Sequence, residues 1–165
     1  MEEMSVFIVN LGKYVEGKET GEWFRCPVDV DEVKGHLELS GDREEYAIHD
    51  YKLPFEIDEY INLEELNRLC GMVEEFDEPI QRALKELAAY YGGVEEVYEH
   101  KDDLIFYVGC DSPEDAAYYL VNDCGILGDI SDEVRMYFDY EAYGRDLVLD
   151  EAILDTGKGI FGLLR

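Results

Sequence analysis

The sequence predicts a mixed α+β protein built from three small units, and three observations lead to this prediction. Short apolar stretches near both ends of the chain alternate with polar residues, a pattern typical of strands. Between them, apolar residues recur at helical spacing in segments that end at glycine. Of the 165 residues, 47% are apolar and 13% aromatic, enough to fill hydrophobic cores. We therefore expect a folded chain.

The first unit, residues 1–61, combines strands with one helix. The stretches SVFIVNLG and GEWFRCP predict two strands, and EEYAIHDYKLP predicts a third. Between the second and third strands, Asp29 is a candidate N-cap, with Glu32 three residues later as in a capping box. These signals predict a small α/β unit.

The second unit, residues 62–103, is helical throughout. The stretches NLEELNRLCGMVEEF, EPIQRALKELAAYYGG and VEEVYEHKDD predict three helices, the second with a glycine stop. In the first of them, Leu63, Leu66, Leu69 or Cys70, and Val73 share one face. We expect that face to be buried and the acids to point outward.

The third unit, residues 104–165, returns to an α/β pattern. LIFYVG predicts a buried strand, and Ser112 with Pro113 predicts the start of a helix that ends near Gly125. Ser131 is a candidate N-cap for a further helix. The stretches DLVLDEAIL and GIFGLL predict closing strands, and short connections should join the three units.

Charge is the most unusual property of the chain. There are 41 acidic and 14 basic residues, a formal net charge of −27. Acids outnumber bases in each of the three units, so the charge is not confined to a tail or a single patch. Such a surface repels nucleic acid and anionic membranes and attracts basic partners. We therefore expect neither nucleic acid nor membrane among the ligands.

The cysteines and the first residues predict a cytoplasmic protein. The opening MEEMSVFIVNLG has no basic region and no long apolar run, so we expect no secretory signal or membrane span. Cys26, Cys70, Cys110 and Cys124 form no CxxC pair, which predicts reduced thiols without disulfides or zinc. Cys70 and Cys110 should pack in cores.

Motifs associated with catalysis or cofactors have ordinary structural explanations. GKGIFG, at 157–162, matches GxGxxG, but three residues follow it, too few for the helix that would hold a pyrophosphate. DTG, at 155–157, fits a turn at a strand end. The segment 29–40 begins like a calcium loop, but Lys34 and Ser40 replace its required glycine and glutamate. We expect no enzyme activity, cofactor or metal.

Three interpretations of the acidity remain: salt adaptation, cation binding, and imitation of the phosphates of nucleic acid. Salt adaptation usually accompanies depleted lysine, whereas lysines and arginines are equally frequent here. Duplex DNA carries one charge per ~1.7 Å of axis, so 27 charges correspond to roughly 46 Å of duplex, about 13 base pairs. That length suits the DNA groove of a large enzyme.

The motif ISDEVRMYFDYEAYGRDL, together with EEYAIHDYKLPFEIDEY and the opening VFIVNLGKYVEGKETGEWFRCPVD, resembles the ArdA family of antirestriction proteins. The resemblance runs nearly from end to end. In that family, YFDYEAYGRDL lies within the named antirestriction motif.

The resemblance implies an elongated homodimer of three-domain protomers, carried on mobile genetic elements, that mimics bent B-form DNA. Its partners would be type I restriction-modification enzymes, whose DNA-binding groove in the methyltransferase core it would occupy, blocking both restriction and modification. The family's carboxy-terminal domain contributes the dimer contact, which makes the predicted strand Leu104, Ile105, Phe106 and Tyr107 a candidate.

The candidate site is an array of surface carboxylates in which no single member should be essential. From the first unit to the third, its members are Glu44, Glu45, Asp58, Glu59, Glu64, Glu65, Glu74, Glu75, Asp77, Asp132, Glu133, Asp139, Glu141 and Asp146. The motif aromatics are expected to shape its packing: Tyr137, Phe138, Tyr140 and Tyr143. Arg135 and Arg145 should orient neighbouring carboxylates by bidentate pairing.

An alternative function needs the same charge. The chain could be an acidic regulatory protein that binds a basic nucleoid-associated or other DNA-binding protein. The two hypotheses differ in whether affinity follows the groove of a restriction enzyme or a small basic protein.

Overall fold

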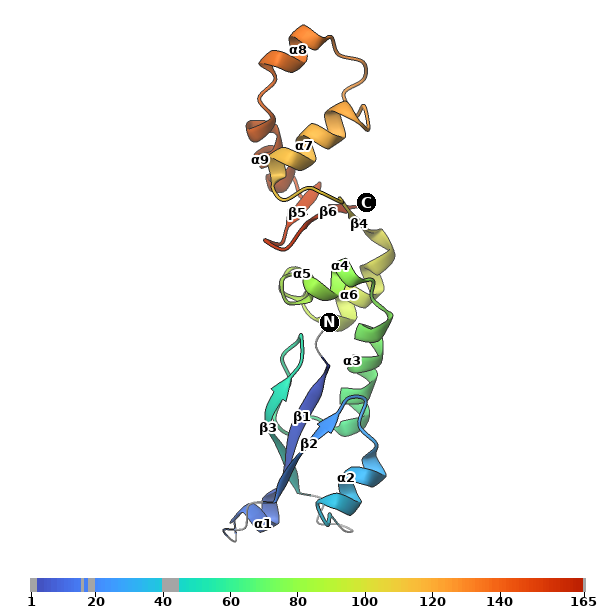
Figure 1. Cartoon of the computed structure of the whole chain (residues 1–165), viewed down its shortest axis with the longest axis vertical. Coiled ribbons are helices and arrows are strands. Elements are labelled where there is room, and N and C mark those ends of the chain that lie inside the picture. The colour runs from blue at the N-terminus through green and yellow to red at the C-terminus, as the bar shows by residue number, and fades with distance from the viewer. Residues whose placement is uncertain (1–2, 16, 18–19, 40–44, 165) are drawn as a thin grey trace. The chain divides into compact units, whose positions relative to one another are not determined.

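The computed structural model describes residues 3–15, 17, 20–39 and 45–164 (Figure 1). Helices and small antiparallel sheets are both present, so the predicted mixed α+β class is confirmed. The chain divides into two compact units, Met1–Tyr98 and Glu99–Arg165, called unit 1 and unit 2 below. The finer division into three units stays a prediction.

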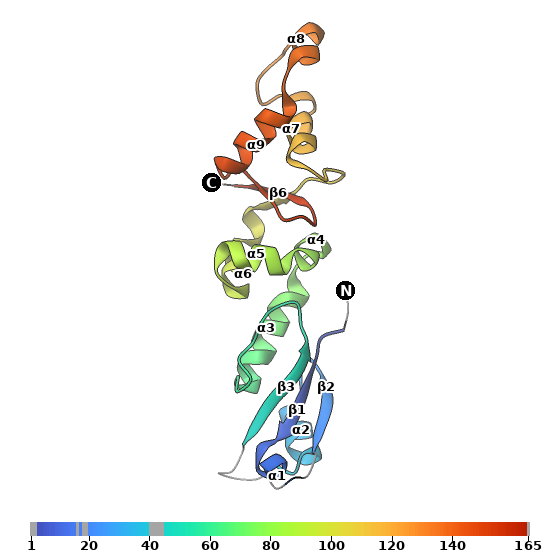
Figure 2. The same cartoon turned by 90° about the vertical axis from the view of Figure 1, so that its left-hand side faces the viewer.

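Unit 1 contains a three-stranded sheet and several helices, which lie beside the sheet and near its two ends (Figures 1 and 2). Its strands are β1 (Ser5–Asn10), β2 (Gly21–Arg25) and β3 (Tyr46–Lys52). Its helices are α1 (Leu11–Val15), α2 (Val30–His36), α3 (Leu63–Glu75), α4 (Glu78–Arg82), α5 (Leu84–Tyr91) and α6 (Val94–His100), the last of which runs into unit 2.

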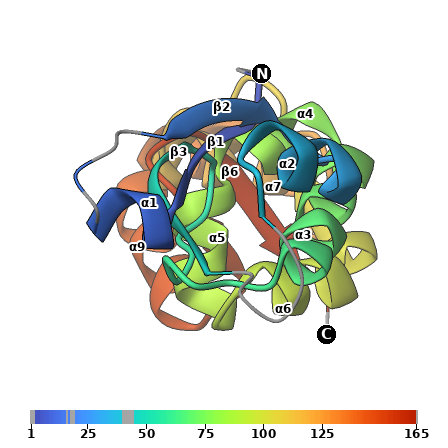
Figure 3. The same ribbon diagram turned by 90° about the horizontal axis from the view of Figure 1, so that it is seen from below.

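The sheet of unit 1 has the order β2-β1-β3, with both pairs antiparallel. The central strand β1 alternates apolar residues that face a core, and Val6 and Ile8 are fully buried. Both α1 and α2 lie toward the same end of the sheet (Figure 3). All three strands predicted for residues 1–61 are therefore confirmed.

Helix boundaries in unit 1 follow the capping signals. The Asp29 carboxylate accepts hydrogen bonds from the backbone N–H groups of Asp31 and Glu32, which starts α2. Asn62 caps α3 in the same way, and α5 ends at Gly92, whose φ of 105° suits glycine. The predicted buried face of α3 is confirmed at Leu63, Leu66, Cys70 and Val73, whereas Leu69 is half-buried.

Unit 2 combines a second small sheet with two packed helices. It begins with a short 3-10 helix, η2 (Lys101–Asp103), and its strands are β4 (Leu104–Phe106), β5 (Ile153–Asp155) and β6 (Ile160–Leu163). Its helices are α7 (Pro113–Asn122), α8 (Asp132–Tyr137) and α9 (Tyr140–Leu149). The strand order is β4-β6-β5, all antiparallel. Cys110, Ala116, Ile153 and Ile160 form a buried cluster.

A close approach between α7 and α9 depends on Gly144. A Cβ atom added to Gly144 would lie 2.4 Å from the carbonyl oxygen of Pro113, which is backbone and cannot move aside easily. Gly144 is accordingly buried although it lies in the middle of α9. The two helices can pack at this distance because Gly144 has no side chain.

Two strand predictions for unit 2 are wrong in part. DLVL, at 146–149, was expected to open a strand but forms the last turn of α9, where Leu147 and Val148 pack on the buried cluster and Leu149 is exposed. The helix continues because Asp139 starts it and α7 covers its inner face. The strand predicted from LIFYVG covers only Leu104–Phe106 and is not buried, because it lies at the edge of its sheet.

The strand-end turn predicted for DTG is present, and the GKGIFG segment runs from this hairpin turn into β6. Residues 156–159 connect β5 to β6, and Thr156 Oγ1 donates a 2.7 Å hydrogen bond to the carbonyl oxygen of Gly159. Gly157 and Gly159 have φ values of 76° and 145°, which side chains rarely allow. These glycines serve the turn.

Candidate functional site

The acidic residues lie on the outside of the chain in both units. Every aspartate and glutamate among the described residues is exposed, except Glu65 and Glu86, which are half-buried. Of the predicted array, Glu44 lies outside the described residues, and the other members are all present at the surface, with Glu65 the least accessible. A partner can therefore reach the array without any change in the fold.

Several members of the array lie at helix N-termini, where they also stabilise the fold. The positive end of the helix dipole favours carboxylates in the first turn. The members placed there are Glu64 and Glu65 in α3, Asp132 and Glu133 in α8, and Glu141 in α9. Asp139 is the N-cap of α9 and accepts a 2.9 Å hydrogen bond from the N–H of Ala142. Local helix stability alone explains acids at these positions.

Glu65 belongs to a small ion-pair network. Arg68 donates to both carboxylate oxygens of Glu65, at 3.0 and 2.5 Å, and also pairs with Glu95. The hydrogen bond from Arg68 holds the pKa of Glu65 below its ordinary value. One cation thus neutralises part of the charge of two carboxylates, so Glu65 is the weakest candidate for contact with a partner.

Glu74, Glu75 and Asp146 have the opposite relation to their helices. They lie in the last turns of α3 and α9, and neither last turn contains a basic residue. A carboxylate near the negative end of the dipole costs about 0.3–1 kcal/mol at an exposed position. A hydrogen bond from the Tyr98 hydroxyl offsets part of this free-energy cost at Glu75, and a 3.6 Å ion pair with Arg145 offsets part of it at Asp146. Helix stability therefore does not explain why acids occur here.

The remaining predicted acids lie in connecting segments of unit 1. Asp58 shapes a turn, because its carboxylate accepts a 2.8 Å hydrogen bond from the N–H of Tyr60. Asp77 is in the N-cap position of α4 but makes no side-chain capping bond. Glu45 and Glu59 are exposed, and their backbone carbonyls accept hydrogen bonds from the N–H groups of Leu11 and Ile48. These side chains are open to solvent.

The motif aromatics separate into two groups. The ring of Phe138 contacts those of Tyr140 and Tyr143, with centroid distances of 4.8 Å and 5.6 Å. Asn122 of α7 donates a 3.1 Å hydrogen bond to the Tyr140 hydroxyl. Tyr137 differs from the packing role expected for it: its side chain is 80% exposed, because it ends a helix with no buried residue.

Helix α8 exposes its apolar side chains. Val134, Met136 and Tyr137, called the α8 apolar surface below, are 49%, 76% and 80% exposed. Ser131 caps the helix by accepting a hydrogen bond from Val134 N–H, and Arg135 pairs with Asp132 through one 3.1 Å contact. The pairing predicted for Arg135 is confirmed, but a single contact replaces the expected bidentate geometry.

A family model described as antirestriction protein (ArdA) matches residues 6–162 of the chain. The chain belongs to the ArdA family of antirestriction proteins. No curated protein matches it. The ArdA match includes the motif that forms α8 and α9, so the exposed acids and the α8 apolar surface are parts of a family region. ArdA is an antirestriction family and not a known enzyme family.

Two structural observations complete the description of this ArdA chain. Within the described ranges, no three His, Cys, Asp or Glu side chains come together in a way that could hold a metal ion. None of the helices in those ranges has both the length and the apolar content needed to cross a membrane.

One residue of the motif was missed by the sequence analysis. Gly144 lies inside the antirestriction motif of ArdA and permits the contact between α7 and α9. Its signal was a glycine within a helical pattern that continues beyond it, which often marks close packing.

Proposed function

We propose that this ArdA protein inhibits type I restriction-modification enzymes by imitating B-form DNA and occupying the DNA-binding groove of the methyltransferase core. The observation that carries the proposal is the placement of the acids. They are exposed in both units, and they include Glu74, Glu75 and Asp146, which oppose their own helix dipoles. Acids kept at a cost to helix stability point to a partner that needs the charge.

The energetic basis of the proposal is competition for phosphate contacts. A DNA-binding groove gains most of its sequence-independent affinity by neutralising phosphates with lysine and arginine and releasing counterions. Exposed carboxylates spread over both units can occupy the same cationic side chains without offering base edges to read. Inhibition should therefore be insensitive to the target sequence of the enzyme and should block modification together with restriction.

Homodimer formation is part of the proposal, and two surfaces of unit 2 could support it. The edge of β4 is the surface predicted from the sequence: β4 pairs only with β6, and Ile105 is 41% exposed while Leu104 and Phe106 are half-buried. An exposed edge strand can pair with a second copy. The α8 apolar surface is the competing location, because apolar residues at this exposure are enriched in protein contacts.

The proposed function is tested by competition for a type I methyltransferase core bound to a labelled DNA duplex. We expect displacement at about one dimer per enzyme and an apparent affinity that falls steeply as salt is raised, since counterion release drives both complexes. A restriction enzyme of type II serves as the specificity control.

Two outcomes would contradict the proposal. The first is failure of folded protein to displace DNA from any type I core. The second is equal or tighter binding to a small basic nucleoid-associated protein, which would favour the regulatory alternative. Because a basic protein of any kind attracts this chain, the deciding quantity is the ratio of the two affinities at the same salt concentration.

A further inference from the structure

Outside the acidic surface, two nucleophilic side chains of unit 1 come into direct contact. Cys26 follows the end of β2, and Cys70 lies on the inner face of α3. Both are buried, and the Cys70 thiol donates a hydrogen bond to the sulfur of Cys26. Cys70 lies in a core, as the sequence predicts. The positions of the cysteines along the sequence do not indicate that Cys26 lies against it.

The contact between the two thiols is held by a neighbouring pair of hydrogen bonds. The side-chain oxygen of Asn67 accepts from Val28 N–H at 2.7 Å, and its amide nitrogen donates to the Val28 carbonyl at 2.8 Å. Asn67 lies one helical turn before Cys70 on the same side of α3, and Val28 follows Cys26 by two residues. The segment after β2, which contains Cys26, is thereby fixed against the part of α3 that contains Cys70.

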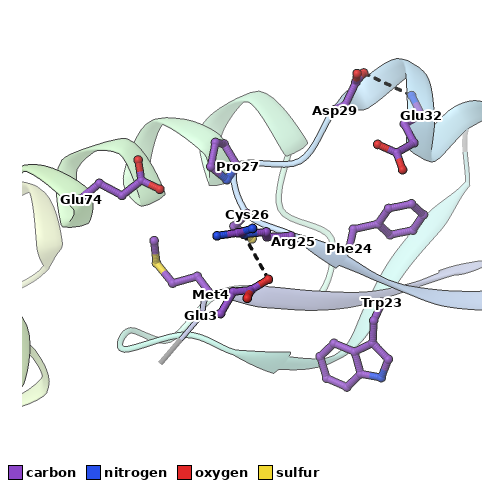
Figure 4. Close-up of a pocket in the computed structure, with 10 residues that line it drawn as sticks. All are labelled: Glu3, Met4, Trp23, Phe24, Arg25, Cys26, Pro27, Asp29, Glu32 and Glu74. Carbon is purple, nitrogen blue, oxygen red and sulfur yellow. Dashed lines mark hydrogen bonds and ion pairs between the residues drawn. The ribbon is translucent and has the colours of Figure 1, made fainter. Parts of the chain in front are cut away.

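The two thiols differ in access to solvent and in acidity. Cys26 is among the residues that line a surface depression of about 710 Å³, between Arg25 and Pro27, with Glu74 on its far side (Figure 4). Cys70 is fully buried. The hydrogen bond from Cys70 lowers the pKa of Cys26, against the opposing effects of burial and Glu74, while donating that bond and burial raise the pKa of Cys70. The sulfur whose pKa is lowered is therefore that of the cysteine that lines the depression.

We propose that Cys26 and Cys70 form a reversible intramolecular disulfide when the protein meets a peroxide, with Cys26 as the attacking and Cys70 as the resolving cysteine. In the first step the Cys26 thiolate attacks one peroxide oxygen, the O–O bond breaks, and hydroxide leaves and takes up a proton to give water. In the second step Cys70 sulfur attacks the sulfenic acid sulfur of Cys26, the S–O bond breaks, and a second water leaves. The peroxide is reduced by two electrons, and the two thiols are oxidised.

The disulfide would link β2 to α3 and close a loop from residue 26 to residue 70. Such a cross-link stabilises mainly by restricting the unfolded chain. For a unit of this size we expect the midpoint of thermal unfolding of unit 1 to rise by roughly 10 °C on oxidation and to return on treatment with a thiol reductant. This chemistry is independent of antirestriction activity.

The test treats the native full-length protein with hydrogen peroxide, blocks the remaining thiols with an alkylating agent in denaturant, and maps tryptic peptides by mass spectrometry. The cleavage pattern places Cys26 in CPVDVDEVK and Cys70 in LCGMVEEFDEPIQR. We expect these two peptides to be joined, with two of the four thiols lost. Cys124→Ser is the matched control, because it removes an exposed cysteine outside the pair and should leave the cross-link unchanged.

Single variants test the assigned roles. Cys70→Ser should stop at a sulfenic acid on residue 26, which dimedone traps, whereas Cys26→Ser should leave Cys70 reduced. A disulfide that joins Cys26 to another cysteine, or a wild-type protein that keeps both thiols reduced while Cys124 is oxidised, would overturn the proposal. If either variant fails to fold, the peptide map and the thermal midpoint of the wild-type protein still decide the outcome.

Discussion

In unit 1 each of the helices α3 to α5 and the central strand β1 buries large apolar side chains, whereas in unit 2 helix α8 buries none. Both units expose their acids equally. Charge is therefore a property of the whole chain, while exposed large apolar side chains are more frequent in unit 2, those of α8 among them. The difference suggests that the acids serve one partner along the whole molecule and that unit 2 has an additional contact to make.

The largest effect is expected from a substitution that disturbs the packing of unit 2 and leaves unit 1 unchanged. Gly144→Ala should destabilise unit 2 by about 3 kcal/mol, because the new Cβ atom would meet the Pro113 backbone at 2.4 Å. Hydrogen exchange of peptides from α7 and α9 measures the effect. Fluorescence of Trp23, the single tryptophan, follows unit 1 and should be unchanged.

The matched control is the helical glycine of unit 1. A Cβ atom added at Gly71 in α3 meets nothing within 4 Å. Gly71→Ala should therefore stabilise unit 1 by about 0.5–1 kcal/mol through helix propensity. Equal exchange rates in α7 and α9 for wild-type and Gly144→Ala protein would show that the close approach of these helices is not needed.

The exposed apolar side chains of unit 2 provide the next test, through self-association. If the edge of β4 forms the dimer contact, Ile105→Asp should weaken dimerisation at least about tenfold, since a charge would be buried in the contact. Met136→Asp should then have little effect. Sedimentation equilibrium measures both, and the reverse result would place the contact at the α8 apolar surface.

A smaller effect distinguishes the acids in the first turn of α3 from the acids in its last turn. Replacing both Glu74 and Glu75 with glutamine should raise the free energy of unfolding by up to about 1 kcal/mol, because it removes repulsion from the negative end of α3. The same variant should weaken inhibition of a type I enzyme several-fold, at about 0–1 kcal/mol per charge. Stability and inhibition should thus change in opposite directions.

The control for this variant is the equivalent change in the first turn of α3. Replacing Glu64 and Glu65 with glutamine removes the same charge but should lower stability, because both acids favour the positive helix end. Inhibition unaffected by either double variant, or by the two combined, would argue against a distributed acidic surface.

The N-cap of α9 gives an effect of similar size that is confined to unit 2. Asp139→Ala should cost about 1 kcal/mol, since the N–H of Ala142 loses its partner. Asp139→Asn keeps the cap and loses the charge, so it should retain most of the stability. Chemical denaturation followed by circular dichroism measures both variants, and equal losses would contradict the capping role.

The smallest expected effect concerns the ion pair between Glu65 and Arg68. Because the pKa of Glu65 is lowered in the folded protein, its stabilising contribution is present above the ordinary carboxyl pKa and is lost as the pH falls through the lowered value. Arg68→Met should return the Glu65 pKa toward its ordinary range. Carboxyl-resolved NMR titration measures the shift, and an unchanged pKa would assign it to another cause.

Much of the fold could be predicted because local signals agree with tertiary packing. The predicted caps at Asp29, Ser112 and Ser131 all start helices where the sequence indicated. The failure at 146–149 has a physical cause: the run LVL fits a strand as well as a helix, and only packing against α7 decides.

The candidate site was less accessible to sequence reasoning. The identity and exposure of the acids could be predicted, because acids are rarely buried. Whether an acid lies in the first or the last turn of a helix depends on the exact helix boundaries. The structure was therefore needed to show that Glu64 favours the dipole of α3 and Glu74 opposes it. The contact of Cys26 with Cys70 is non-local and left no local signal.

Because the carboxylates are exposed, the acidic surface and a basic groove that binds it need not be closely complementary in shape. Carboxylates that are free in water are surrounded by mobile cations, and association with a basic groove sets those cations free along with the anions that neutralise the groove. The resulting gain is entropic and depends little on the exact position of any one charge. A surface of this kind can bind imperfectly matched grooves, so a single inhibitor can act on enzymes that differ in detail.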